Sequence, residues 1–269
     1  MTPGRLAVAS AVVETPDTYA PSRTTRTYDA QIHDTWDILG NANGGYLMAI
    51  LARAALDYSE RPDIVSMSAN FFAPGKPGPV TVKVDPIRMG RRFATVNTSL
   101  RPPDASGPSV TATVVCGDLD AHDGPTMVAR NAPDMPPPDE CPRVEPTDFF
   151  PPPFVGNVDL RMHPNETPGE PRYRAWFRLL DDEPMDSIAA ILAGDGLPPP
   201  VFNTELQVGW SPTVQLTIHI HARPQSGWML IDSHSDIVTG GAFETDTTIF
   251  DGSGQAIARA RQLQLLALG

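Results

Sequence analysis

Basic residues are scarce in this chain. Lysine and arginine total 20 against 32 aspartates and glutamates, which gives a formal net charge of −12, and Lys76 and Lys83 are the only lysines. Nucleic acids and anionic membranes are bound through clusters of positive charge. The composition therefore argues against both as the main partner. An anionic small molecule remains compatible with it, because arginine, the commoner basic residue here, is the better fork for phosphate.

Cysteines and long apolar runs are also scarce. Cys116 and Cys141 are the only cysteines, too few for a disulfide framework or a zinc site. No apolar run reaches 18 residues, and the N-terminal apolar stretch is too short for a signal peptide. We expect a soluble, reduced, cytoplasmic protein that does not insert into membranes.

Proline and glycine, in contrast, are abundant, with 30 and 21 residues. This composition favours short strands and long loops over a helical bundle. The first part of the chain predicts a strand at 25–33, a helix at 43–58, and strands at 64–72, 79–88, 92–100 and 109–119. Because the helix is apolar on nearly every side, we expect it to be buried.

The second part of the chain repeats this order. We predict a strand at 172–180, a helix from Met185 to Asp195, and strands at 213–224, 227–238, 243–252 and 254–268. Prolines between the two parts disfavour helix and central strand, so we interpret that stretch as a surface linker. The predicted organisation is an N-terminal unit at 1–120, a linker at 121–170 and a C-terminal unit at 171–269, with both units sharing one core. A short edge strand is also expected at Thr18–Ala20.

Two alignment offsets support a duplication. An offset of 150 aligns seven identical residues, among them Pro62 with Pro212, Thr95 with Thr245 and Thr98 with Thr248. In the strand after each helix, the alternation of apolar residues fits an offset of 149 better. A one-residue insertion in a loop explains the change, since a shift of one residue reverses every side chain of a strand.

Four stretches carry a resemblance to a known family: the NGGY that opens the first helix, ANFFAPGKPGPVTVKVDPIRMGRR, PTVQLTIHIHARP and the closing ARARQLQLL. Their order and spacing resemble the acyl-CoA thioesterase II family and the related thioesterase-like superfamily. The resemblance implies an α+β double hotdog fold, in which two tandem units each wrap a curved antiparallel sheet around a buried helix. It also implies an acyl-CoA substrate, no cofactor, and a homodimer or higher homo-oligomer.

The resemblance further implies the site. The family's carboxylate, hydroxyl and amide match Asp195, Thr213 and Gln262, which would hold and polarise a water molecule that attacks the thioester carbonyl. Gly44 and Gly45 would lie near the carbonyl oxygen. The chemistry needs such parts independently, because hydrolysis requires a base for water, and N–H groups free at a helix N-terminus can stabilise the developing oxyanion.

Each of these residues also has a structural interpretation. Asp195 can simply form an Asp-Gly turn after the helix. Thr213 can be an ordinary β-branched strand residue on the face shared by Gln215, Thr217 and His219. Gln262 lies on a face of small residues that indicates close packing on a helix, where its amide needs a partner.

The glycines and Asn43 also have structural interpretations that involve no catalytic role. Gly44 and Gly45 can merely permit close packing, and Asn43 is best explained as a helix N-cap. A second, degenerate site near Asp57 is conceivable, but Ile64 replaces the hydroxyl residue there. One working site is therefore expected.

Charged and imidazole side chains give weaker signals. Arginines at equivalent turns of the two repeats are predicted to bind the phosphates of coenzyme A, with a solvated turn as the alternative: Arg88, Arg91, Arg92 and Arg223. His219 and His221 have a spacing that can chelate zinc, but surface roles are commoner, and we expect no metal.

Two rival functions stay open. Hotdog hydratases and dehydratases use an aspartate and a histidine five residues apart, whereas the nearest pairs here, Asp29/His33 and Asp118/His122, are four apart. The other rival is a protein that binds acyl-CoA or a fatty acyl group without turning it over. The sequence does not exclude it.

Overall fold

The computed structural model describes residues 4–15, 25–121, 124–147, 151–206, 209, 211–224 and 227–267. The helices are α1 (Arg5–Ala9), α2 (Gly44–Ser59) and α3 (Ser187–Ala193), with 3-10 turns η1 (Asp34–Trp36), η2 (Pro138–Glu140), η3 (Pro153–Asn157) and η4 (Pro200–Asn203). The strands of the first half are β1 (Val12–Thr15), β2 (Arg26–Ile32), β3 (Asp37–Ile38), β4 (Asn41–Ala42), β5 (Asp63–Phe71), β6 (Gly78–Met89), β7 (Ala94–Arg101) and β8 (Val110–Gly117). Those of the second half are β9 (Val158–Met162), β10 (Arg172–Leu179), β11 (Thr213–Ile220), β12 (Met229–His234), β13 (Val238–Thr239), β14 (Ala242–Asp251) and β15 (Ala256–Leu265).

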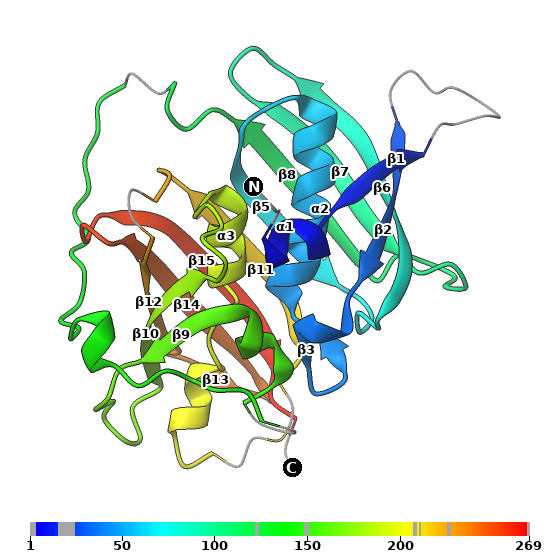
Figure 1. Cartoon of the computed structure of the whole chain (residues 1–269). Coiled ribbons are helices and arrows are strands. Elements are labelled where there is room, and N and C mark those ends of the chain that lie inside the picture. The colour runs from blue at the N-terminus through cyan, green and yellow to red at the C-terminus, as the bar shows by residue number, and fades with distance from the viewer. Residues whose placement is uncertain are drawn as a thin grey trace.

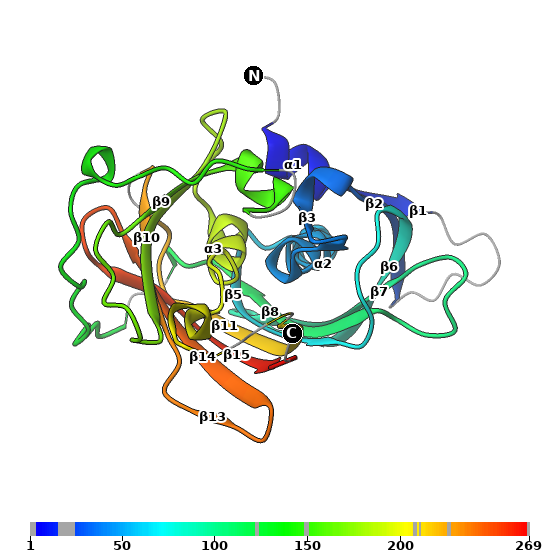
Figure 2. The same cartoon turned by 90° about the horizontal axis from the view of Figure 1, so that it is seen from below.

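One curved antiparallel sheet runs through both halves of the molecule. Its strand order is β1-β2-β6-β7-β8-β5-β11-β15-β14-β12-β10-β9, with β13 paired to β14. The order β2-β6-β7-β8-β5 in the first half corresponds to β10-β12-β14-β15-β11 in the second half. The two halves meet at a seam where β5 pairs with β11. Figures 1 and 2 show α2 and α3 side by side on the concave side of this sheet. The predicted double hotdog fold is confirmed.

The helix α2 forms where the sequence predicts it. Asn43 caps its N-terminus, since its side chain accepts a hydrogen bond from the Tyr46 N–H at 2.9 Å. Its interior holds alanine, leucine and methionine without proline, a composition that favours helix. Most of its side chains are buried against the sheet and α3, as expected of a helix that is apolar all round. The chain leaves the helix at Glu60, which adopts a left-handed conformation with φ of 52°.

The seam between the halves shows their equivalence directly. Strands β5 and β11 pair so that Ser68 lies opposite Thr217, and the two hydroxyl oxygens are 2.8 Å apart. These residues are related by the offset of 149 predicted for this strand. The register shifts within each strand also correspond, because the extra residue is Val65 in β5 and Val214 in β11.

The offset of 150 is wrong for the strands β7 and β14. Thr98 pairs with Ala112 and faces the helices, whereas Thr248 pairs with Arg259 on the outer face. The inward-facing counterpart in β14 is Thr247, opposite Ala260. Threonine suits both faces of a strand, so a Thr–Thr match did not fix the register.

Part of the predicted linker is regular structure. Strand β9 pairs with β10, and Phe154 in η3 is buried against Trp36, with ring centroids 6.0 Å apart. The preceding stretch is fastened across the outside of the second half, for example by the Trp176 indole N–H, which donates to the Pro136 carbonyl at 2.7 Å. The predicted domain boundaries stay a prediction. The edge strand predicted at Thr18–Ala20 lies outside the described residues.

Among the described residues, no helix is both long and apolar enough to span a membrane.

Candidate active site

Asp195 lies where the two central helices meet. It follows the C-terminal end of α3, directly beside the N-terminus of α2. Its Oδ2 atom accepts hydrogen bonds from the Gly45 backbone N–H at 2.8 Å and from the Asn43 side-chain amide at 2.9 Å. A carboxylate at a helix N-terminus is stabilised by the unpaired N–H groups and the helix dipole.

Gln262 joins Asp195 to Thr213. Its amide nitrogen lies 2.9 Å from Asp195 Oδ1 and 2.5 Å from Thr213 Oγ1. Gln262 is only 6% exposed and sits on the inner face of β15. The three side chains implied by the resemblance therefore meet in one place, although they come from a helix end and two strands. We call these three residues, with Asn43 and Gly45, the Asp195 cluster.

A β-bulge puts Thr213 into the cluster. Thr213 pairs with the inward-facing Gln264, but Gln215 pairs with the outward-facing Leu263, because Val214 is an extra residue between them. The prediction that Thr213 shares a face with Gln215 is therefore wrong. Simple alternation fails here because a bulge reverses the side-chain direction on one side of it.

The electrostatics of Asp195 reflect two opposing effects. Burial raises the pKa of its carboxyl above the ordinary value of 3.8, because charge is costly away from water. Hydrogen bonds from the Gly45 N–H, the Gln262 amide, the Gly44 N–H and the Asn43 amide act in the opposite direction and favour the carboxylate. A carboxyl with a raised pKa in a hydrogen-bonded cluster is suited to accept a proton.

The two glycines make the close approach of α2 possible. A Cβ atom on Gly44 would lie 3.0 Å from Asp195 Oδ2, and one on Gly45 would lie 3.0 Å from Asp195 Cβ and 3.2 Å from the Leu192 backbone. Side chains at these positions would push the helix N-terminus away from the carboxylate. The packing interpretation of Gly44 and Gly45 is thus confirmed, and their role toward a carbonyl oxygen stays a prediction.

The inner face of β15 packs on α3 as its small residues predict. A Cβ on Gly194, at the end of α3, would lie 3.5 Å from the Ala260 side chain. Gly194 thus lies against this face of β15, one residue before Asp195. The structural and catalytic interpretations of these residues are therefore compatible.

The equivalent position of the first half is apolar. Ile64 takes the place of Thr213, and the neighbouring Val114 and Cys116 take the places of Gln262 and Gln264. All three are fully buried, and burial raises the pKa of the Cys116 thiol to about 11. Asp57 points elsewhere, since its side chain is half-exposed and accepts from the Tyr28 hydroxyl at 3.0 Å.

The predicted phosphate-binding arginines lie at the other end of α2. Arg61, two residues beyond the helix, donates to the backbone carbonyls of Gly90 and Arg91 at 3.0 and 3.2 Å. The turn that carries Arg88, Arg91 and Arg92 is therefore separated from Gly44 by the length of the helix, roughly 22 Å at 1.5 Å per residue. The structure does not bring these exposed arginines to the Asp195 cluster.

In the part of the chain that the structure describes, the other candidate groups form no site. Within the described ranges, no three His, Cys, Asp or Glu side chains are arranged to hold a metal ion. His219 is exposed on the outer face of β11. Asp29 is exposed on β2, and His122 lies outside the described residues.

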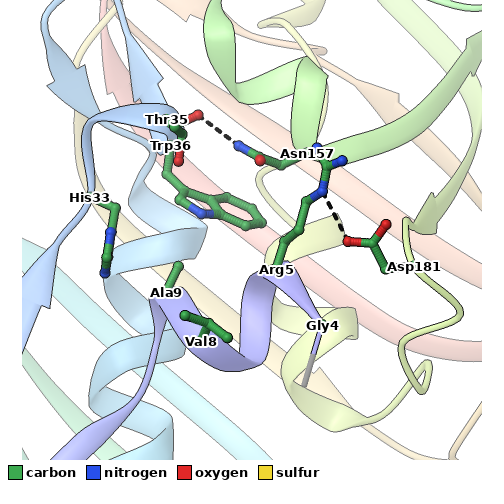
Figure 3. A pocket seen from close by; sticks show the side chains of 9 residues that line it. All are labelled: Gly4, Arg5, Val8, Ala9, His33, Thr35, Trp36, Asn157 and Asp181. Carbon is green, nitrogen blue, oxygen red and sulfur yellow. Dashed lines mark hydrogen bonds and ion pairs between the residues drawn. The ribbon is translucent and has the colours of Figure 1, made fainter. Parts of the chain in front are cut away.

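A separate cavity of about 280 Å³ lies where α1, η1 and the second half meet (Figure 3). Arg5 on its wall donates to Asp181 at 3.0 Å, and Asn157 donates to the Thr35 carbonyl at 2.7 Å. None of the residues that line it belongs to the Asp195 cluster.

One member of the cluster, Asn43, was not predicted from the sequence to contact Asp195. Asn43 was assigned only as a helix cap, but its side-chain amide also donates to the Asp195 backbone carbonyl and carboxylate, both at 2.9 Å. The residue type could have indicated a second partner, because asparagine keeps two N–H donors after its oxygen has capped a helix.

Comparison with known proteins agrees with this architecture. The chain matches the family model of the acyl-CoA thioesterase N-terminal domain at residues 32–117 and that of the C-terminal domain at residues 138–266. An uncharacterized protein of Mycobacterium tuberculosis is 26% identical, with 90% of this chain and 91% of that protein covered.

Solved structures extend the comparison. A candidate thioesterase II from Thermobifida fusca is 28% identical, with a TM-score of 0.86 and 99% of both chains covered. A hot dog fold protein of unknown function from Alicyclobacillus acidocaldarius is 21% identical, with a TM-score of 0.84 and 98% of both chains covered, which shows the shared fold. With both family models matched in order along it, the chain belongs to the acyl-CoA thioesterase family.

Proposed function

We propose that this protein hydrolyses acyl-CoA to a free carboxylic acid and coenzyme A at the Asp195 cluster. The observation that carries the proposal is the hydrogen-bonded set of Asp195, Gln262 and Thr213, a carboxylate with two polar partners, in a chain of the thioesterase family. Such a set can bind a water molecule and take its proton.

The reaction assigns a role to each member of the set. Asp195 Oδ1 accepts a proton from water as the water oxygen attacks the thioester carbonyl carbon. Gln262 and Thr213 orient that water. The tetrahedral intermediate then expels the coenzyme A sulfur as the C–S bond breaks, and the proton returns from Asp195 to the thiolate. The products are the carboxylic acid and the free thiol.

We also predict that the backbone N–H groups of Gly44 and Gly45 stabilise the carbonyl oxygen of the substrate. The Gly45 N–H already donates a hydrogen bond to Asp195 Oδ2, so in this structure its partner is the catalytic carboxylate. The phosphate contacts of Arg88, Arg91 and Arg92 are likewise predictions. The pantetheine arm of coenzyme A would have to span the length of α2 to bring its phosphates to them.

The test is a thiol-trapping assay of the purified protein against short, medium, long and aromatic acyl-CoAs. We expect release of free coenzyme A and a fall of more than ~10²-fold in kcat/KM for Asp195→Asn. Asp57→Asn, a carboxyl change near the end of α2, is the matched control and should retain wild-type activity. Circular dichroism and melting temperature establish that both variants are folded.

Other outcomes separate the alternatives. Activity that survives Asp195→Asn would keep the hydrolase and reject the site. Intact acyl-CoA retained by the protein, with no turnover on any substrate, would favour a binding protein instead.

A further inference from the structure

Asn43 uses its whole side chain at the junction of the two helices. Its Oδ1 atom accepts from the Tyr46 N–H at 2.9 Å and so caps α2. Its amide nitrogen donates to the Asp195 backbone carbonyl and to Asp195 Oδ2, both at 2.9 Å. The residue is only 2% exposed, so water does not compete for these bonds.

These bonds distinguish the two oxygens of the Asp195 carboxylate. Asn43 and Gly45 both donate to Oδ2, whereas Oδ1 receives its bond from Gln262, beside Thr213. An oxygen that already accepts two hydrogen bonds is less available to a further donor. The carboxylate is thereby fixed with Oδ1 toward the side where Thr213 and Gln262 meet.

We infer that Asn43 is a positioning residue for hydrolysis, which holds the Asp195 carboxylate so that Oδ1 is the oxygen offered to water. This inference rests on the proposed function. Asn43 acts through Asp195 and does not itself need to touch the substrate. A backbone bond and a carboxylate bond from one amide restrict both the position and the rotation of the Asp195 side chain.

The cluster offers few competing influences on this carboxylate. The partners that shift the pKa of Asp195 are all neutral N–H groups, from Gly45, Gln262, Gly44 and Asn43. In the described part of the chain no ion pair involves Asp195. Loss of the Asn43 hydrogen bond should therefore change the pKa of Asp195 without interference from a neighbouring charge.

The other helix supplies a matched control. Asp186 caps α3 by accepting from the Ile188 and Ala189 N–H groups, both at 2.9 Å. It has no side-chain N–H donor and lies at the opposite end of α3 from Asp195. Asp186→Ser therefore perturbs a cap without perturbing the carboxylate.

The experiment compares Asn43→Ser and Asn43→Asp with Asp186→Ser. Serine and aspartate both cap helices well, but neither donates an N–H to Asp195. We expect Asn43→Ser to lower kcat by roughly tenfold to a hundredfold with a smaller change in KM. The acid limb of its pH–rate profile should move up by about one pH unit, since a hydrogen bond to the carboxylate is lost. Asn43→Asp should move it further, because a second carboxylate repels the first.

The outcomes decide between positioning and capping. Wild-type kcat and an unmoved acid limb in both Asn43 variants would overturn the inference and leave Asn43 as a cap only. An equal loss of kcat in Asp186→Ser would also overturn the inference, since a weakened helix cap would then be enough to explain the lower kcat. Failure of both Asn43 variants to fold would assign the residue to stability and would contradict the inference too.

A readout without turnover keeps the two proposals distinct. The carboxyl ¹³C resonance of Asp195, identified by its loss in Asp195→Asn, reports its titration directly. If wild-type protein hydrolyses no acyl-CoA, the proposed function fails. An upward shift of the Asp195 pKa in Asn43→Ser would still support the control of this carboxylate by Asn43, and an unchanged pKa would overturn it.

Discussion

The two ends of the helix pair have the same backbone plan but opposite chemistry. At one end, Thr213 and Gln262 surround a carboxylate, whereas at the other Ile64 and Val114 occupy the equivalent strand positions and are fully buried. Even the bulge that turns Thr213 inward has its counterpart at Val65. The bulge therefore belongs to the duplicated fold, and the side chains placed on it distinguish a polar site from a packed core.

The same contrast extends along the inner sheet. In the second half, buried hydroxyl and amide groups line the concave face beside Gln262, including Thr245, which donates to Gln264 at 2.8 Å. The corresponding first-half positions are Val96 and Cys116. Polar groups on this face find partners among themselves, as buried polar groups must. The second half thus supplies Gln262 and Thr213 to the cluster, while the first half supplies Asn43 and Gly45.

The largest effect is expected when the polar end is given the side chains of the apolar end. Gln262→Val, which copies Val114, removes the donor to Asp195 Oδ1 and the partner of Thr213. We expect kcat/KM to fall by roughly tenfold to a hundredfold in the thiol-trapping assay. Gln255→Val, a change directly before β15 and away from the cluster, should leave kcat/KM unchanged. Full activity in Gln262→Val would refute the role of the amide.

The reverse exchange tests whether polarity alone makes a site. Ile64→Thr places a hydroxyl in the apolar end without a carboxylate or amide partner, and the unpaired group should reduce the free energy of unfolding by about 1–3 kcal/mol. Urea denaturation measures this change. Activity should stay at the wild-type level, while the reciprocal Thr213→Val should lose activity with little effect on stability. A gain of turnover in Ile64→Thr would contradict the single-site interpretation.

The pH dependence of stability should also distinguish the two ends. Because burial raises the pKa of Asp195, the folded state binds its proton more tightly than the unfolded state does. The stability contributed by this proton is therefore present below the ordinary value of 3.8 and is lost as the pH rises through the folded-state pKa. We expect the free energy of unfolding of wild type, measured against Asp195→Asn, to decline across that window. A difference that is flat with pH would show that Asp195 titrates normally.

The smallest effect is expected at the arginine turn. Since Arg91 and Arg92 lie at the far end of α2, their joint replacement by glutamine should leave kcat unchanged and alter KM by less than about threefold, the scale of an exposed charge contact. Steady-state kinetics at two salt concentrations measure this. A much larger, salt-dependent rise in KM would support the phosphate contact predicted from the sequence.

Several features followed from the sequence because they depend on neighbours along the chain. Alternating apolar residues and turn residues predicted the strands, and the all-round apolar helix predicted the buried position of α2. The Asn43 cap was also predictable, because a cap involves residues only three apart. The family resemblance then selected Asp195, Thr213 and Gln262 from many similar polar residues.

Tertiary structure decided what depends on distant residues or on irregular backbone. No local pattern reveals the bulge at Val214, the strand within the predicted linker, or the bonds between Asn43 and Asp195, which are 152 positions apart. The physical reason is that side-chain direction and hydrogen-bond partners at such points are set by how helices and strands pack. By itself, then, the sequence determined a duplicated fold of buried helices and antiparallel strands. Packing of α2 against α3 decided how Asn43, Gly45 and Gln262 surround the Asp195 carboxylate.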